Sequence, residues 1–364
     1  TQLFGERMII ANATGCSSIW GGTFPTMPYT TFKNGKGPAW ANSLFEDNAE
    51  YGLGFRLAVD ANRRQLKSQL ERLLEADIHG ELKECVATCL KLWTEIGDEA
   101  QANAGTLRRE LVNAAKIAAG GLAEILAKAI ELQDYAVDKS VWIIGGDGWA
   151  YDIGYGGLDH VLAQNRNVNV MVLDTEVYSN TGGQASKATP FGSIAKFASA
   201  GKHTGKKDLG LMAMSYGTSY VASIALGANP VQAVKAMSEA ESYNGPSIII
   251  AYAPCIAHGI DMSTTPDIEK NAVESGYWVL YRYDPRRSTA GQNPLLFDSK
   301  EPTMSVLKFI AAEKRYSQLK SVNPKEYEKL YGLLENDVTR KYNYLKKLSE
   351  IEQADICQSF ICME

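Results

Sequence analysis

Between residues 141 and 254, continuous apolar runs alternate with helix-forming segments, and this alternation restricts the fold more than any other feature of the chain. The runs expected to be strands are 141–146, 167–175, 209–215 and 246–254. Asn229 followed by Pro230 is a typical helix start and precedes the last of them. Such strands, joined by helices, form a parallel sheet with helices on both faces. The sequence therefore predicts an α/β fold whose ligands bind beyond the carboxyl ends of the strands.

The segments on either side of this core have a different character. Residues 7–13 are apolar and read as a buried strand that ends before Gly15 and Cys16, whereas 20–58 lack periodicity and predict a long ordered loop. Residues 58–134 have apolar side chains at helical spacing, which predicts two or three amphipathic helices, the last interrupted near Gly120. Residues 303–350 are charged and predict a peripheral helical extension with a turn near Asn323 and Pro324.

Composition narrows the possible partners. The 364 residues are 45% hydrophobic and carry a net charge of −5 without a run of like charges, which argues against nucleic-acid and membrane partners. The six cysteines are scattered, so we expect a reducing compartment rather than a disulfide framework. They are Cys16, Cys85, Cys89, Cys255, Cys357 and Cys362.

The segment GGDGWAYDIGYGGLDH at 145–160 follows a predicted strand directly and carries the clearest chemical signal. Glycines at a strand end allow the backbone to approach a phosphate, and the start of the next helix favours anions. Asp147 lies among these glycines, and a carboxylate beside a phosphate requires a cation between them. Magnesium fits because it prefers carboxylate, carbonyl and phosphate oxygens. A tight turn with a capping aspartate is the structural alternative.

A second polar segment follows the next predicted strand. It begins at Asp174 and continues through Thr175, Val177 and Asn180 to a pair of glycines. Asp147 and Thr175 are 175 − 147 = 28 residues apart, which is the length of a helix and a strand. Both segments should therefore meet at one edge of the sheet.

The pair of segments resembles the thiamine-diphosphate motif, in which GDG is followed by a helix, a strand and a second magnesium ligand. The resemblance assigns magnesium to Asp147, the Thr175 hydroxyl and the Val177 carbonyl, and cofactor contacts to Gly146 and Gly148. The motif usually has Asn at the position of Thr175, and Thr is typical of pyruvate:ferredoxin oxidoreductases. Further segments similar to that family are ATGCSSIWGG (13–22), GPAWANSLFEDNAEYG (37–52), YSNTGGQASKATP (178–190) and YAPCIAHGI (252–260).

The resemblance also assigns roles to side chains outside the motif. Cys16 and Cys255 correspond to two of the four thiolates that bind a 4Fe–4S cluster, whereas without it they would be read as small buried apolar residues. Ile19 would support the bent cofactor, and Asn180 would face the substrate as a catalytic residue. His258 and Cys255 alone do not make a zinc site, so we expect His258 to be structural or to line a pocket. Cys85 and Cys89 are expected to be packed thiols, and Cys357 and Cys362 are left unassigned.

The family implies an organisation and an activity. Residues 1–290 would form the thiamine-diphosphate-binding domain, with 58–134 as a helical insertion and 291–364 as a C-terminal helical extension. The expected reaction is oxidative decarboxylation of pyruvate to acetyl-CoA and CO2, with electrons passed through 4Fe–4S clusters to ferredoxin or flavodoxin. The partners would be pyruvate, coenzyme A and the electron carrier. The longer chain would form a homodimer in the cytoplasm, or in a hydrogenosome-like organelle of a eukaryote.

Three alternatives remain open at this stage. The enzyme could use another 2-oxoacid, it could be a non-redox thiamine-diphosphate decarboxylase or carboligase, or the fold could serve a non-catalytic role. A non-redox enzyme gives no reason for Cys16 and Cys255, and the intact pair of Asp147 and Thr175 argues against a non-catalytic role. The chain begins at Thr1 and lacks two of the cluster cysteines, so we expect a piece of a longer polypeptide that is inactive alone.

Overall fold

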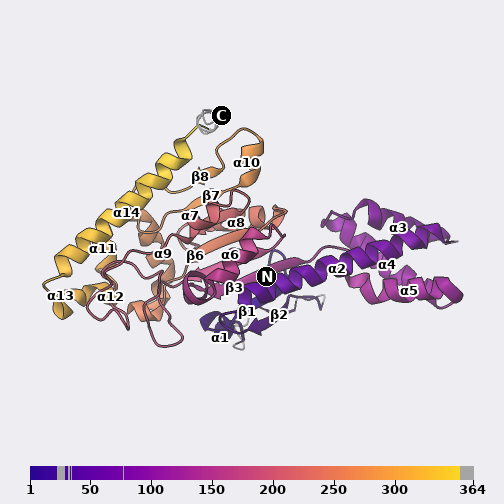
Figure 1. The fold of residues 1–364 in the computed structure, drawn as a ribbon, viewed down its shortest axis with the longest axis horizontal. Helices are drawn as coiled ribbons and strands as arrows, with labels where there is room; N and C mark the ends of the chain where they lie inside the picture. Colours follow the sequence, from indigo (N-terminus) through magenta and orange to yellow (C-terminus); the bar gives the residue numbers. More distant parts are fainter. Residues whose placement is uncertain (23–28, 32, 34, 77, 353–364) are drawn as a thin grey trace. The chain divides into compact units, whose positions relative to one another are not determined.

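A computed structural model describes residues 1–22, 29–31, 33, 35–76 and 78–352, and these residues divide into two compact units (Figure 1). The first unit comprises the described residues of Thr1–Ile9, Thr31–Pro38 and Leu53–Val141. The second comprises those of Ile10–Thr30, Ala39–Gly52 and Trp142–Glu364. The sequence motifs that predict chemistry all lie in the second unit.

The first unit is built from helices. They are most of α2 (Asn48–Glu75), then α3 (Gly80–Lys91), α4 (Asp98–Ala115), α5 (Gly120–Leu132) and the short η1 (Gln133–Tyr135). Their apolar faces form a core of leucines that also contains Cys85 and Cys89, so the prediction of packed thiols is confirmed. The expected break is also confirmed, because α5 begins at Gly120 with a φ of +60°. The described residues of 58–134 contain four α-helices rather than two or three, and the first of them, α2, begins earlier, at Asn48.

The second unit contains an eight-stranded sheet in the order β2-β1-β3-β4-β6-β5-β7-β8. The strands are β1 (Met8–Ala13), β2 (Ala39–Ser43), β3 (Ser140–Gly146), β4 (Asn169–Asp174), β5 (Tyr220–Ile224), β6 (Ser247–Tyr252), β7 (Tyr281–Tyr283) and β8 (Leu295–Phe297). The pairs β3/β4, β4/β6 and β5/β6 are parallel, whereas β5/β7 and β7/β8 are antiparallel. The predicted α/β fold is therefore confirmed, with an antiparallel edge added.

The remaining helical elements belong to the second unit and surround this sheet. They are α1 (Cys16–Gly22), η2 (Gly148–Ile153), α6 (Tyr155–Ala163), α7 (Leu209–Met214), α8 (Pro230–Ser242), η3 (Ile256–His258), η4 (Met262–Thr264), α9 (Thr265–Glu274), α10 (Pro285–Thr289), α11 (Val306–Ile310), α12 (Lys314–Ser317), α13 (Leu319–Val322) and α14 (Tyr327–Glu350). All five residues of β5 are buried, as expected for a strand that is covered on both faces. The predicted cap is present, because Asn229 Oδ1 accepts the Gln232 amide at 3.0 Å.

Three further sequence predictions differ from the structure. Residues 209–215 form helix α7 rather than a strand, because Asp208 caps it by accepting the Leu211 amide at 3.0 Å. The strand that lies between β6 and β7 is instead β5, which was not predicted from the apolar pattern. The expected loop at 20–58 contains β2 and the start of α2. The C-terminal region is helical as predicted, and α14 follows the expected turn, but it is not wholly peripheral because Tyr316 and Leu319 are completely buried.

None of the described helices has the length and apolar character needed to cross a bilayer.

Candidate functional site

Asp147 lies where β3 ends and the helical turn η2 begins. Its side chain is 1% exposed, and the following turn is a π-helix, a geometry that is common at functional sites. A Cβ on Gly148 would lie 2.4 Å from the Tyr178 ring, which explains why glycine follows the aspartate. The Tyr178 hydroxyl in turn donates to the Gly148 carbonyl at 3.2 Å. The segment that contains Asp147 and the segment that contains Tyr178 thus pack directly against each other.

Thr175 and Val177 lie just beyond the end of β4, and the Thr175 hydroxyl contacts Asp147. The Thr175 hydroxyl lies 2.8 Å from Asp147 Oδ1 and 2.9 Å from the Val177 carbonyl oxygen. The expectation that the two segments meet at one sheet edge is confirmed by these contacts. Three oxygen atoms converge here with only one hydroxyl hydrogen among them. A hard cation such as Mg²⁺ would satisfy all three, so the donor set fits a magnesium ion.

The electrostatics of Asp147 support the same fit. The contacts described for its carboxylate are hydroxyl groups, Thr175 on one oxygen and Ser186 on the other at 2.6 Å. Burial, reinforced by the nearby Asp174 carboxylate, raises the pKa of Asp147 to about 7. A divalent cation on this carboxylate would reverse that effect, because an opposite charge favours the ionised form.

Ser186 is a residue of this site that the sequence analysis missed. Its hydroxyl donates to Asp147, and its backbone amide is held by the Thr189 hydroxyl at 2.9 Å. It lies inside the segment 178–190, but a serine among Gly, Gln and Ala has no pattern that distinguishes it from a loop residue. Only the fold shows that it orients the carboxylate.

Behind the turn that carries Thr175 and Val177 lies a buried ionic network. The Lys206 ammonium contacts Asp174 at 2.7 Å and Glu176 at 2.9 Å, and Glu176 also contacts Arg315 at 2.7 Å. Burial alone would raise the pKa of Glu176, but Lys206 and Arg315 outweigh it and hold that pKa at about 2. Glu176 is therefore ionised at neutral pH. Asp147 differs, because burial raises its pKa.

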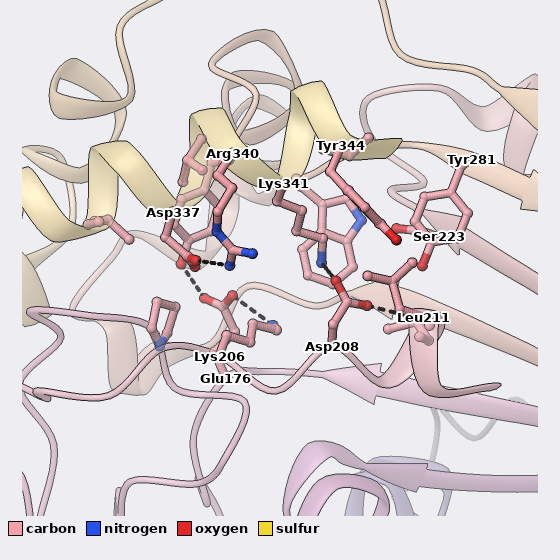
Figure 2. A pocket seen from close by; sticks show the side chains of 18 of the residues that line it. Glu176, Lys206, Asp208, Leu211, Ser223, Tyr281, Asp337, Arg340, Lys341 and Tyr344 are labelled. Atoms are coloured by element: carbon pink, nitrogen blue, oxygen red, sulfur yellow. Dashed lines mark hydrogen bonds and ion pairs between the residues drawn. The ribbon is translucent and has the colours of Figure 1, made fainter. Parts of the chain in front are cut away.

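A cavity of about 110 Å³ borders this network (Figure 2). Glu176 and Lys206 line one side, and Asp337, Arg340, Lys341 and Tyr344 of α14 line another. Asp208 closes it further through an ion pair with Lys341 at 2.9 Å. Asp147, Thr175 and Val177 are not among its lining residues, so this cavity is separate from the converging oxygens.

Cys16, Ile19 and Asn180 lie near the same edge of the sheet. Cys16 begins α1 just beyond β1 and is exposed, with its Sγ 3.0 Å from the Ser179 hydroxyl. Ser179 directly precedes Asn180, which is also exposed. Ile19, one turn along α1, is 58% exposed. The structure thus brings Cys16 to the loop that contains Asn180.

Cys255 and His258 follow β6, the strand next to β4. Cys255 is buried, and His258 is completely buried with its Nε2 2.7 Å from the Thr175 carbonyl oxygen. Of the two expected roles for His258, structural or pocket-lining, its burial and this contact favour the structural one. Within the described part of the chain, no three His, Cys, Asp or Glu side chains form a group that could hold a metal ion. Cys357 and Cys362 lie outside the described residues.

Comparison with known proteins identifies relatives for nearly the whole chain. Residues 108–251 match the family described as "Thiamine pyrophosphate enzyme, C-terminal TPP binding domain". A pyruvate:ferredoxin oxidoreductase from Moorella thermoacetica is 53% identical over 353 residues, which is 96% of this chain and 30% of that protein. A pyruvate-flavodoxin oxidoreductase from Trichormus variabilis is 51% identical over 359 residues, 97% of this chain and 29% of that protein.

The chain therefore spans less than a third of the length of these relatives. Among solved structures, a 2-oxoglutarate:ferredoxin oxidoreductase from Magnetococcus marinus, with 2-oxoglutarate, coenzyme A and succinyl-CoA bound, covers 70% of this chain and 56% of its own. The TM-score is 0.40 and the identity 16%, a likeness too weak to transfer the role of any residue.

Proposed function

Because the chain is homologous over 96% of its length to pyruvate:ferredoxin and pyruvate-flavodoxin oxidoreductases, we propose that it carries the thiamine-diphosphate site of such an enzyme. The observation that carries the proposal is the convergence of Asp147, Thr175 and Val177 oxygens at the end of two adjacent parallel strands. Ligands of parallel α/β sheets bind at this position.

Magnesium would be held by the Asp147 carboxylate, the Thr175 hydroxyl and the Val177 carbonyl. The ion would join these oxygens to the cofactor's diphosphate, since Mg²⁺ in proteins is commonly shared between carboxylates and phosphates. Gly146 and Gly148, which flank Asp147, would contribute backbone contacts to the cofactor. The hydroxyl of Ser186 keeps the second Asp147 oxygen in place, because it donates to that oxygen at 2.6 Å.

Ile19 and Asn180 would serve the reactive part of the cofactor. The exposed Ile19 side chain would support the bent cofactor, which would also cover its apolar surface. Asn180 would face the substrate, to which its side-chain amide could donate a hydrogen bond. Both positions lie at the sheet edge where the diphosphate would bind, which supports these roles.

Cys16 and Cys255 would supply two of four thiolates to a 4Fe–4S cluster. Cys16 follows β1 and Cys255 follows β6, so both come after strands of the same sheet. The other two thiolates would come from the remainder of the longer protein. The position of Cys16 beside Ser179 would bring this cluster close to the cofactor, where it could remove electrons singly.

The reaction would convert pyruvate and coenzyme A to acetyl-CoA, CO2 and a proton, with an electron pair passed to the acceptor. Thiamine diphosphate supplies the electron sink for decarboxylation when it is bound. This chain would orient the cofactor through Asp147 and contact the substrate through Asn180. Cys16 and Cys255 would help to hold the cluster that accepts the electrons. Ferredoxin or flavodoxin would receive the electrons.

The test is a titration of thiamine diphosphate into the full-length enzyme after removal of bound cofactor, with Mg²⁺ and then with a chelator. We expect thiamine diphosphate to bind saturably only when Mg²⁺ is present. The enzyme should also contain iron, and it should reduce a viologen dye when pyruvate is added. Binding that is equally tight with the chelator would contradict the metal site. Cofactor-dependent decarboxylation without iron would indicate a non-redox enzyme instead.

A further inference from the structure

The turn between the two magnesium ligands of the second segment has an unusual backbone. Glu176 lies between Thr175 and Val177 and has a φ of +58°, one of three positive values among the described non-glycine residues. This left-handed conformation is unfavourable for a residue with a Cβ, so it persists only where its surroundings hold it. Because the turn sets the direction of the Val177 carbonyl, whatever holds Glu176 also sets the metal site.

Backbone contacts hold the turn only in part. The Glu176 amide donates to Asp174 Oδ1 at 3.1 Å, and the Thr189 hydroxyl donates to the Glu176 carbonyl at 2.6 Å. The side chain of Glu176 makes the charged contacts. It accepts from Lys206 at 2.9 Å, from the Tyr277 hydroxyl at 2.6 Å and from Arg315 at 2.7 Å. A glutamate that is 1% exposed is thus held by two cations and a hydroxyl.

Arg315 connects this turn to a distant part of the chain. It lies 139 residues beyond Glu176, in α12, and its guanidinium is buried. Its Nε donates to Glu313 at 2.6 Å, which fixes the direction in which its other nitrogen reaches Glu176. Its own carbonyl accepts the Ile194 amide at 2.8 Å. The guanidinium therefore has little freedom to follow Glu176 if the turn moves.

His258 contacts the other side of the same turn. Its Nε2 lies 2.7 Å from the Thr175 carbonyl, and its Nδ1 lies 3.8 Å from Glu313, the carboxylate that also holds Arg315. A separation of 3.8 Å is too long for a hydrogen bond, so the contact that links this region to the turn is the one between Arg315 and Glu176. A buried ion pair adds little net stability, because desolvation offsets the attraction, but it can select one backbone conformation.

We propose that Arg315 is a positioning residue for the magnesium ion: through Glu176, it holds the left-handed turn so that the Thr175 hydroxyl and the Val177 carbonyl face Asp147. The inference rests on the proposed function, since it assumes that these oxygens bind the metal. The described hydrogen bonds of Arg315 involve Glu176, Glu313, Tyr277 and Ile194, none of which is a proposed magnesium ligand. Arg315 acts by keeping the turn in its binding conformation, and any loss of that population lowers the metal affinity in proportion.

The chain contains a matched control for this arginine. Arg282, on β7, is also buried, and it is also held by two carboxylates, Asp298 at 2.8 Å and Glu239 at 2.7 Å. Its network lies at the antiparallel end of the sheet and contains none of the magnesium ligands. Arg315→Met and Arg282→Met therefore remove comparable buried ion pairs, and only the first lies next to the metal turn.

The experiment uses the full-length enzyme stripped of cofactor, with thiamine-diphosphate binding measured by calorimetry at increasing Mg²⁺. Arg315→Met should raise the half-saturating Mg²⁺ concentration by about 10- to 100-fold, the usual effect of losing a residue that orients a metal ligand. Arg315→Lys should give an intermediate value, and Arg282→Met should stay within about twofold of the wild type. Amide exchange of residues 176 and 177 without Mg²⁺ should be faster in Arg315→Met and unchanged in Arg282→Met.

An unchanged Mg²⁺ requirement in Arg315→Met would overturn the proposal, and so would an equal increase in Arg282→Met. If Arg315→Met fails to fold, Glu176→Gln decides, because it removes the charge pair and preserves the shape of the side chain. An unchanged Mg²⁺ requirement in Glu176→Gln would then overturn it. Asp147→Ala is measured in parallel. Normal binding by Asp147→Ala would show that the metal site itself is misassigned, whereas loss there with no effect at Arg315 would reject only the positioning role.

Discussion

The helical unit and the end of the parallel sheet both contain buried side chains, but they bury different chemistry. The core of the helical unit consists of leucines, alanines, Cys85 and Cys89, with a few other apolar residues. At the end of β3 and β4, the buried residues are Asp147, Asp174 and Glu176, with Lys206 and Arg315 beside them. Apolar burial stabilises a fold directly, whereas buried charges require partners. The helical unit also buries Arg56 and Arg63, but both pair with Asp138. The described contacts of Asp147, by contrast, are hydroxyl groups, and the proposed magnesium ion would supply the opposite charge.

Asp147→Ala should have the largest effect on cofactor binding at the sheet edge. It removes the only carboxylate of the proposed magnesium site, so thiamine-diphosphate affinity in the presence of Mg²⁺ should fall by more than about 100-fold. Calorimetry on the full-length enzyme measures this loss. The unfolding temperature should not fall, because the variant also removes a buried carboxylate whose pKa burial raises to about 7. If Asp147→Ala bound thiamine diphosphate with normal affinity, the buried charges at the sheet edge would have no role in binding the cofactor.

The cysteines provide the next comparison. Cys16→Ser or Cys255→Ser should eliminate the cluster nearest the cofactor, a loss of about four iron atoms per chain, and leave the other clusters intact. Cys85→Ser and Cys89→Ser are the controls, because both thiols lie in the helical core. Iron analysis and electron paramagnetic resonance distinguish the two pairs. A full iron content in both Cys16→Ser and Cys255→Ser would refute their assignment as ligands.

Leu70→Ala should lower stability without changing cofactor binding. Leu70 is completely buried among the helices, and its truncation leaves a cavity that should lower the unfolding free energy of this unit by about 2–5 kcal/mol. Amide exchange of peptides from 58–134 reports that loss. The affinity for thiamine diphosphate should not change, and a large decrease would show that the helices contribute to the cofactor site.

Thr175→Val should lower the cofactor affinity less than Asp147→Ala does. It removes a neutral ligand that a water molecule can replace, so the affinity in the presence of Mg²⁺ should fall by about tenfold. Calorimetry under the conditions used for Asp147→Ala allows the two to be ranked. If Thr175→Val lost as much affinity as Asp147→Ala, the hydroxyl would contribute more than a single exchangeable ligand.

The sequence revealed those parts of the molecule that depend on local pattern. Strands β3, β4 and β6 appear as apolar runs, the cap of α8 appears as Asn229 with Pro230, and the spacing of Asp147 and Thr175 predicts their contact. Helix α7 was misread because a short apolar run is compatible with a strand or a buried helix, and only the capping Asp208 distinguishes them.

The contacts that orient the site could not be predicted in the same way. Ser186 reaches Asp147 across 39 residues and Arg315 reaches Glu176 across 139 residues, distances over which no local pattern operates. The left-handed turn at Glu176 carries no glycine to indicate it. Such contacts depend on how β4, the following loops and α12 pack together, which only the three-dimensional structure reveals.

The most direct test of the account is the position of the metal. Crystals of the full-length enzyme with thiamine diphosphate and Mn²⁺ in place of Mg²⁺ would reveal the ion by its anomalous scattering. We predict one ion with Asp147, the Thr175 hydroxyl, the Val177 carbonyl and the diphosphate as ligands, at roughly the 2.0–2.1 Å typical of Mg²⁺–oxygen distances. An ion bound to other residues, or cofactor bound without an ion next to Asp147, would contradict the central claim.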